Sequence, residues 1–459
     1  MIFTKKFRIK TFFSKILTPQ RIFILSFVGL ILVGTFFLSL PLAASKHSLR
    51  FIDALFTSTS AVCVTGLTVL DIGKDLTFAG QVVTIILFQI GGLGIITFST
   101  IFFVLMGRGI SFKGRDIVQS TFLHTPRMDF FVILKSVIWF TLFFEGLGTL
   151  FLWIRFSRDF STGPALFHAL YNAISAFNNC GYSLFSDNLI GYQGDLIVNL
   201  TIMGMIIMGG IGFVVQFELL AKIKKLRKKL SLHTKIVLIT TLVLILSGAF
   251  IIYVMERNLI MKGLPLQNQI LASFFQAVTP RTAGFNTVDI GRLANETILI
   301  IIMFMFIGAS PGSTGGGIKT TSAALLFLML WNRMRGNEEV NVFRRTIPRE
   351  VIGRTFSIIF ASAFSIALIA SILLLTGGGS LPPLESRHLF VEYLFETVSA
   401  YGTVGLSMGI TPKLNDAQKL AIVLMMFAGR IGPLTLAFSL SRSALRRSFT
   451  YAEEGVMVG

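Results

Sequence analysis

A glycine that could help to bind a cation lies near the end of each of four similar twelve-residue stretches. An aromatic residue precedes this glycine by ten positions in every stretch, in the pairs Phe56/Gly66, Tyr171/Gly181, Phe274/Gly284 and Phe395/Gly405. Backbone carbonyl groups can replace the hydration shell of a monovalent cation, and glycine adopts the positive φ angles that such a backbone needs. The repeat therefore predicts four loops that meet around one ion site.

The candidate coordinating residues are the glycine of each stretch and the two residues before it. They are Val64, Thr65 and Gly66; Asn179, Cys180 and Gly181; Thr282, Ala283 and Gly284; and Thr403, Val404 and Gly405. None is a carboxylate, which favours a monovalent ion, since pores for divalent ions generally use acidic rings. The alternative is that these are helix-capping glycines in ordinary loops. Four copies in register disfavour it.

The third stretch is the least regular. A serine lies six residues before the glycine in the other three, at Ser60, Ser175 and Ser399, whereas Val278 takes that place in the third. We therefore expect any fourfold symmetry to be poorest there. Arg281 also lies within this stretch, and we expect it to anchor the loop to a carboxylate, with Glu396 as one candidate.

Each stretch follows an apolar segment that is too short to cross a bilayer and lies between two longer apolar runs. The short segments are predicted as half-helices at 51–62, 164–178, 269–279 and 390–400. Their C-terminal ends carry a partial negative charge that favours a cation. The long runs are predicted as spans at 22–40, 81–106, 130–154, 195–220, 234–255, 296–330, 353–375 and 416–440.

The predicted fold class is an all-α membrane protein with eight transmembrane helices and four re-entrant pore loops (P-loops) in a pseudo-fourfold arrangement. Its four tandem units are residues 1–110, 111–230, 231–335 and 336–459, the last with a C-terminal tail. We call them units 1 to 4. With 53% hydrophobic and 14% charged residues, the composition agrees with a polytopic membrane protein.

The net charge of +19 has an uneven distribution that orients the chain. Of 41 Lys and Arg residues, 26 lie in the five segments 1–21, 107–128, 222–235, 333–354 and 442–447. Because cytoplasmic loops collect basic residues, both termini are predicted to be cytoplasmic in a multi-pass plasma membrane protein, surrounded by lipid. The charge is thereby explained without a nucleic-acid partner. The first helix is predicted to remain uncleaved.

The last span of unit 3 contains a glycine-rich segment that a helix cannot cross unbroken. It comprises Gly308, Ser310, Pro311, Gly312, Ser313, Thr314, Gly315, Gly316 and Gly317. The spacing excludes a nucleotide-binding P-loop, because Ile318 stands where the lysine should be. A flexible plug is our interpretation, and a static kink is the alternative. Lys319 follows, and it either faces the pore or extends to the cytoplasmic interface.

Other chemical groups are few. Arg430 lies in the last span, where a charge usually faces a cavity or a partner. Cys63 and Cys180 are interpreted as buried packing residues rather than as a disulfide. The five histidines show no metal spacing and no Ser/His/Asp set is visible, so we expect no enzyme and no covalently bound cofactor.

These features resemble the superfamily of K⁺ transporters that contains bacterial Ktr and Trk subunits, fungal Trk and plant HKT proteins. The resemblance covers about residues 20–445 and is closest to the KtrB-type membrane subunit. Thr403-Val404-Gly405 is similar to the start of a K⁺-channel filter. Glycine at all four filter positions, Gly66, Gly181, Gly284 and Gly405, implies K⁺ rather than Na⁺.

The resemblance also implies regulation and assembly. Residues 308–318 would form an intramembrane gating loop under the filter, Arg430 would approach the pore and limit flow, and Lys319 could share that role. The chain would pair as a homodimer on a cytosolic ring of nucleotide-binding, KtrA-like regulatory subunits. K⁺ would be the transported ion, with Na⁺ dependence left open.

Two alternatives remain at this stage, a Na⁺-selective pore and a secondary transporter of another solute. A transporter with broken helices would point half-helix N-termini at its site and would contain inverted repeats. The repeats predicted here are parallel, with half-helix C-termini at the site, which favours the pore.

Overall fold

The computed structural model describes residues 19–45, 48–106, 130–226, 229–377, 382–433 and 435–436. The predicted basic segments 107–128 and 442–447, most of segment 1–21 and the C-terminal tail at 451–459 lie outside the described residues. In the described part, the chain is helical apart from one short antiparallel hairpin of β1 (Asn341–Val342) and β2 (Arg345–Thr346).

The helices follow the predicted order of long and short segments. Units 1 and 2 contain α2 (Pro19–Ser39), α3 (Phe51–Val62), α4 (Ile72–Asp75), α5 (Phe78–Met106), α7 (Phe130–Phe156), α8 (Thr162–Phe177), α9 (Leu196–Gly210) and α10 (Phe213–Ile223). Units 3 and 4 contain α11 (Leu232–Glu256), α12 (Leu266–Val278), α13 (Asn295–Phe306), α14 (Thr320–Met334), α15 (Arg349–Gly377), α16 (Pro383–Gly402) and α17 (Asp416–Ile431). Three-residue 3-10 helices begin at Pro41, Ile190, Ile290 and Thr411.

Among the described residues, three helices are long and apolar enough to cross a membrane: 135–156, 232–256 and 349–377. The bent pair α9 and α10 would make a fourth if it is counted as one span. Shorter apolar helices cover 23–39, 51–62, 78–94 and 295–306.

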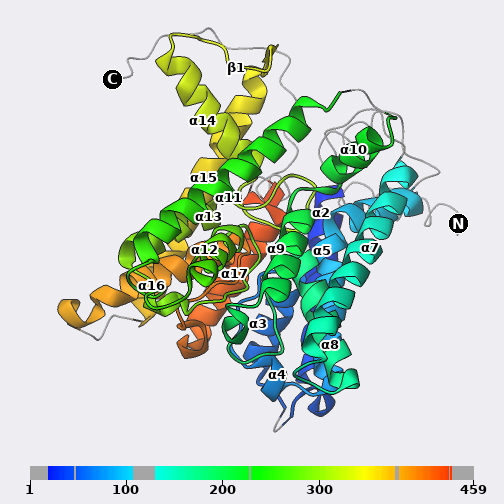
Figure 1. Cartoon of the computed structure of the whole chain (residues 1–459), viewed down its shortest axis with the longest axis vertical. Coiled ribbons are helices and arrows are strands. Elements are labelled where there is room, and N and C mark those ends of the chain that lie inside the picture. Colours follow the sequence, from blue (N-terminus) through cyan, green and yellow to red (C-terminus); the bar gives the residue numbers. More distant parts are fainter. Residues whose placement is uncertain are drawn as a thin grey trace, which may run out of the picture.

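The distribution of polar side chains is the reverse of that in a water-soluble protein. Thr57, Ser58 and Ser60 on α3 are fully buried, whereas Phe250 on α11 and Phe360 on α15 are exposed. A bilayer stabilises such an apolar perimeter, and water does not. Figure 1 places α10 and β1 near one end of the molecule and α4 at the opposite end.

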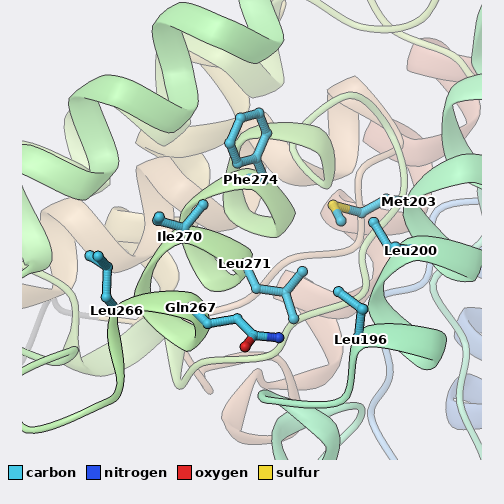
Figure 2. Close-up of a pocket in the computed structure, with 8 residues that line it drawn as sticks. All are labelled: Leu196, Leu200, Met203, Leu266, Gln267, Ile270, Leu271 and Phe274. Carbon is cyan, nitrogen blue, oxygen red and sulfur yellow. The ribbon is translucent and has the colours of Figure 1, made fainter.

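The perimeter also contains an apolar groove of about 620 Å³ between α9 and α12. Figure 2 shows side chains from both helices lining it, namely Leu196, Leu200, Met203, Leu266, Gln267, Ile270, Leu271 and Phe274. Only Gln267 is polar, so the groove suits hydrocarbon rather than an ion or a polar solute.

Two spans that the sequence predicts as continuous are broken in the structure. The span predicted at 195–220 bends by 101° between α9 and α10, and the one predicted at 416–440 leaves the helix after Ile431. Gly212 and Gly432 follow the last turns with nearly equal angles, φ/ψ of 92/139° and 90/139°. A positive φ of this kind ends a helix, and glycine adopts it without a Cβ clash.

Unit 4 is joined to unit 1 by ion pairs at the start of their helices. Lys419 Nζ on α17 lies 2.7 Å from Asp53 Oδ1 on α3, and their side chains are 7% and 19% exposed. Arg50 Nη2 and Asp416 Oδ1 are 3.1 Å apart, but both side chains are 60% exposed. Removing one partner should therefore destabilise the protein more at the buried pair than at the exposed pair.

We predict that Asp53→Asn lowers the free energy of unfolding by about 2 kcal/mol, because it leaves the buried Lys419 ammonium without this carboxylate. Asp416→Asn is the matched control and should cost less than about 1 kcal/mol, since its pair is exposed. Denaturation of both variants in detergent micelles measures the difference. Equal losses in the two variants would contradict the prediction.

Candidate ion-conducting site

Each of the four repeated stretches leaves its half-helix through a loop with the same unusual backbone. We call residues 64–66, 179–181, 282–284 and 403–405 the glycine loops. The first residue of each has a positive φ, at 55° for Val64, 60° for Asn179, 68° for Thr282 and 50° for Thr403. The glycines follow at 93°, 82°, 74° and 91°. Non-glycine residues rarely adopt such angles, and four at equivalent places indicate a functional constraint.

The four glycine loops contact one another in a closed ring that follows chain order. A Cβ built on Gly66 would overlap the carbonyl oxygen of Cys180, and one on Gly405 would overlap that of Thr65. Between them, a Cβ on Gly181 would lie 2.5 Å from Ala283 O, and one on Gly284 would lie 2.5 Å from Val404 O. Each glycine thus packs directly against the middle carbonyl of the next loop. The structure therefore brings all twelve predicted filter residues into one cluster.

Hydrogen bonds from the half-helices hold these loops. Ser60 Oγ accepts from Gly66 N and Ser399 Oγ accepts from Gly405 N, both at 3.1 Å. In the first, second and fourth glycine loops, the backbone N–H of the middle residue donates at 2.8 Å to the carbonyl oxygen five positions earlier. The pairs are Thr65/Ser60, Cys180/Ser175 and Val404/Ser399. In loop 3, Ala283 N donates instead to Thr279 O, only four positions earlier. The third copy is thus the irregular one, as the sequence predicts.

All four loop glycines line one cavity of about 310 Å³. Most of its remaining lining is polar, with hydroxyl groups, amides and the carboxylates of Asp71 and Asp187. Asp71 caps α4, so this cavity lies toward the end of the molecule opposite α10 (Figure 1). A polar cavity that reaches the glycine loops from one end can hold hydrated ions.

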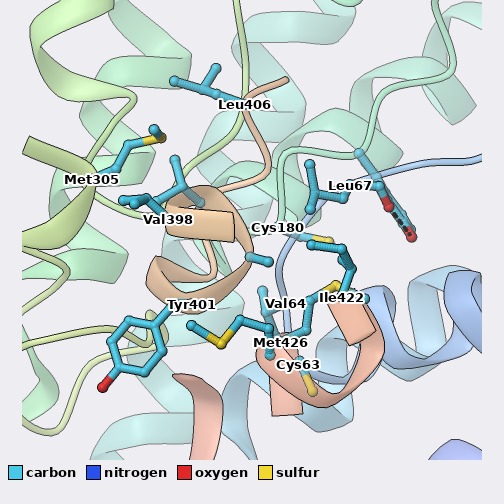
Figure 3. Packing of buried hydrophobic residues seen from close by; sticks show 14 of the residues in the cluster. Cys63, Val64, Leu67, Cys180, Met305, Val398, Tyr401, Leu406, Ile422 and Met426 are labelled. Carbon is cyan, nitrogen blue, oxygen red and sulfur yellow. Dashed lines mark hydrogen bonds between the residues drawn. The ribbon is translucent and has the colours of Figure 1, made fainter. Parts of the chain in front are cut away.

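The side chains of both cysteines lie in the apolar core, Cys63 just before the first glycine loop and Cys180 within the second. Cys63 and Cys180 are both free and fully buried. Figure 3 shows them among Val64, Leu67 and Met426. The interpretation of these cysteines as packing residues is confirmed.

The predicted break in unit 3 is present as a loop between α13 and α14, which we call the broken-helix loop (residues 307–319). Gly308 N donates to Ile318 O at 2.8 Å and closes its two ends. Its middle reaches the glycine loops, because Gly316 N donates to Thr403 Oγ1 at 3.0 Å. Gly315 packs so closely against Thr282 Oγ1 that a Cβ would overlap it.

The broken-helix loop is also bonded to the breaks in units 2 and 4. Phe213 N, the first amide of α10, donates to Gly312 O at 2.9 Å. Ser310 N donates to Gly210 O at 3.0 Å, and Gly317 N donates to Gly429 O at 3.3 Å. The bend at Gly212 thus has a physical reason that the local sequence does not contain. The loop of unit 3 accepts a hydrogen bond from α10 where α9 stops.

Arg430 is 2% exposed and joins three units. Its Nη1 donates to Thr314 O in the broken-helix loop, and its Nη2 donates to Gly91 O and Gly92 O on α5. Lys319 Nζ donates to Gly315 O at 2.8 Å. Both side chains therefore donate to carbonyl groups of the broken-helix loop, and Arg430 donates to those of α5 as well. Lys319 does not extend away from the loop.

The expectation that a carboxylate anchors Arg281, with Glu396 as one candidate, is wrong, because a hydroxyl group takes that place in the described part of the chain. Arg281 Nη2 donates to Thr241 Oγ1 on α11 at 3.1 Å. Glu396 instead accepts from Ser407 Oγ at 2.9 Å and from Thr411 Oγ1. Each side chain therefore binds hydroxyl groups of its own unit.

Sequence reasoning also missed a second repeat that builds the inner part of the site. The segments begin at Gly91, Gly209, Gly308 and Gly429, which lie 25, 28, 24 and 24 residues after the loop glycines. Three of them read Gly-x-x-Gly, and the glycines at 91, 209 and 429 pack against the last carbonyls of their own half-helices. The motif does not by itself predict a break, because α5 runs unbroken through Gly91 to Gly94, but it places Arg430 where units 1 and 2 have glycine.

Comparisons with known proteins identify the family. The TrkH family, described as "Cation transport protein", matches residues 20–446. The chain is 39% identical to Ktr system potassium uptake protein B of Bacillus subtilis, over 96% of this chain and 97% of that protein. It is 33% identical to potassium/sodium uptake protein NtpJ of Enterococcus hirae, over 97% and 98% of the two chains.

A solved structure is similar as well. The potassium transporter TrkH from Vibrio parahaemolyticus superposes with a TM-score of 0.71 at 20% identity, covering 93% of this chain and 86% of that one. At this identity the likeness concerns the fold. The family match over nearly the whole chain establishes membership, and this protein belongs to the TrkH family of cation transport proteins.

Proposed function

We propose that this protein carries K⁺ into the cell across the plasma membrane, with the four glycine loops as its selectivity filter. The observation that carries the proposal is the closed ring in which each loop glycine packs against the middle carbonyl of the next loop. Such a ring concentrates carbonyl oxygens around one point, and carbonyl oxygens can replace the water around K⁺. The names of the relatives from Bacillus subtilis and Vibrio alginolyticus, both potassium uptake proteins, support K⁺ as the ion.

The backbone rather than the side chains performs the selection in this proposal. The loop side chains differ among the four units, whereas the alternation of positive φ angles is common to all. That alternation lets successive carbonyls face the same side of the chain. The half-helices α3, α8, α12 and α16 add the negative ends of their dipoles at the same point.

The broken-helix loop and Arg430 form the gate. The loop is bonded to Thr403 of one glycine loop and packs against Thr282 of another. An ion that leaves the filter in the direction of α10 meets this loop before it meets the cytoplasm. Opening requires the loop to release its bonds to units 2 and 4, and the Arg430 guanidinium holds it in place.

The wider architecture belongs to the same proposal. Eight spans and four re-entrant loops place both termini in the cytoplasm, and the apolar groove of Figure 2 lies against lipid. The chain functions as a homodimer on a cytosolic ring of nucleotide-binding subunits. Dependence on Na⁺ is supported by the name of the potassium/sodium uptake relative, and a Na⁺-conducting pore is the competing function.

We predict that Gly66→Ser reduces K⁺ uptake and its preference over Na⁺ by about tenfold, because the new Cβ displaces the carbonyl of Cys180. Uptake by cells that lack other K⁺ transporters, measured with K⁺ and Na⁺ in competition, tests this. Gly29→Ala on α2 is the control, since a Cβ there has nothing within 4 Å. Na⁺ uptake that exceeds K⁺ uptake in the unaltered protein would contradict the proposed function.

For the gate, we predict that Arg430→Ala increases K⁺ flux into proteoliposomes several-fold, since Thr314 loses the bond that holds the loop. Deletion of residues 312–317 should also increase the K⁺ flux. Arg335→Ala is the control, because that arginine is exposed and lies over Trp331 rather than against the loop. A folded Arg430→Ala protein with unchanged flux would exclude the gating role.

A further inference from the structure

One carboxyl group lies in the middle of a predicted span. Glu145 is 16 residues into the run 130–154, whereas the first spans of the other units, 22–40, 234–255 and 353–375, contain no Asp or Glu. Glu145 is only 7% exposed. A carboxyl at such a depth is costly, and it normally serves an interior partner.

The partners of Glu145 come from two other helices. Its Oε1 accepts from Asn178 Nδ2 at 3.0 Å, and its Oε2 accepts from Gln89 Nε2 at 3.3 Å. Asn178 Nδ2 also donates to Gln89 Oε1, so each of the three side chains is hydrogen-bonded to the other two. Side chains of α5, α7 and the C-cap of α8 thus form one small network between units 1 and 2.

This network lies directly behind the second glycine loop. Asn178 is the C-cap of half-helix α8, and the next residue, Asn179, already has the positive φ of the loop. The loop itself packs between loops 1 and 3, since Gly66 meets Cys180 O and Gly181 meets Ala283 O. A shift of Asn178 would therefore move a loop that touches two others.

The network also borders the gate. Gly92 on α5 packs so closely on Asn178 that a Cβ there would overlap its Oδ1. The carbonyl of the same Gly92 accepts from Arg430 at 3.1 Å. Asn178 is thus fixed on one side by Glu145 and Gln89, and on the other by the backbone that holds the gating arginine.

An apolar residue at position 145 would suit the membrane better, so the benefit of a carboxyl must lie in its two acceptor oxygens. They direct the amide groups of Asn178 and Gln89, which would otherwise compete for the few acceptors nearby. The corresponding positions of the other stretches, Cys63, Arg281 and Gly402, have no such amide.

We infer that Glu145 is a positioning residue for the second glycine loop and thereby sets the preference for K⁺ over Na⁺. Glu145 acts through Asn178, without touching the ion. This inference rests on the proposed function, because it assumes that the loop is part of a K⁺ filter.

The test uses the full chain in proteoliposomes with opposing KCl and NaCl gradients. Glu145→Ala should lower the K⁺-over-Na⁺ ratio by about tenfold, because Gln89 Nε2 loses its acceptor and Asn178 Nδ2 keeps only Gln89 Oε1 and Ile174 O, so that the loop after Asn178 is held less firmly. Asn178→Ala should have a similar effect, and the double variant should be no worse than either single one, because the two residues form one unit. Glu145→Gln keeps the size and one acceptor oxygen and should lower the ratio by only about threefold.

Thr141→Val is the control, because Thr141 is buried on α7 one turn before Glu145 and its hydroxyl has no hydrogen-bond partner among the residues that the structure describes. It should retain the unaltered ratio. The inference fails, and Glu145 is a packing residue, if Glu145→Gln and Glu145→Ala keep the K⁺-over-Na⁺ ratio and lose only thermal stability. It also fails if the double variant lowers the ratio by the product of the two single effects. If Glu145→Ala does not fold, the K⁺-over-Na⁺ ratio of Glu145→Gln alone tests the inference. A ratio of one in the unaltered protein would instead overturn the proposed function, and this inference with it.

Discussion

Backbone without helical hydrogen bonds must find partners within the protein when it lies at membrane depth, because no water is available there. This constraint governs the inner part of the molecule. The glycine loops are bonded to their own half-helices, as with Gly66 N and Ser60 Oγ, and packed on one another. The broken-helix loop is satisfied by Thr403 and by the breaks of its neighbours. Irregular segments are thus tolerated here only as a group.

That mutual dependence explains why breaks occur in three units together. Once α13 ends at Phe306, its loop has carbonyl and amide groups to satisfy, and the straight continuation of α9 would satisfy none of them. The bend at Gly212 aims Phe213 N at Gly312 O. The α10 helix then leads to the basic segment 222–235, so a displacement of that segment can reach the broken-helix loop through a single hydrogen-bonded junction.

Local signals predict three of the half-helices well, because an apolar segment of fixed length before a glycine loop is a local pattern, whereas α16 begins at Pro383, before the predicted start at 390. The bounds of α3 agree with the prediction of 51–62, and the third stretch is irregular as its Val278 suggests. Partners distant in sequence could not be predicted in this way. Charge alone makes Glu396 a candidate partner of Arg281, yet hydroxyl groups bind both side chains. The break at Gly212 and the role of Glu145 depend on contacts from another unit, which no local pattern contains.

The four units are alike at the glycine loops but differ in the second repeat. At the position after the first glycine of the second repeat, the four units have Gly92, Gly210, Ala309 and Arg430. Four arginines there would place four like charges at one point, which electrostatic repulsion forbids. One arginine is sufficient, because its guanidinium reaches unit 3 through Thr314 and unit 1 through Gly91 and Gly92. The proposed filter needs four equal loops, whereas the proposed gate needs only one element that can move and one group that holds it.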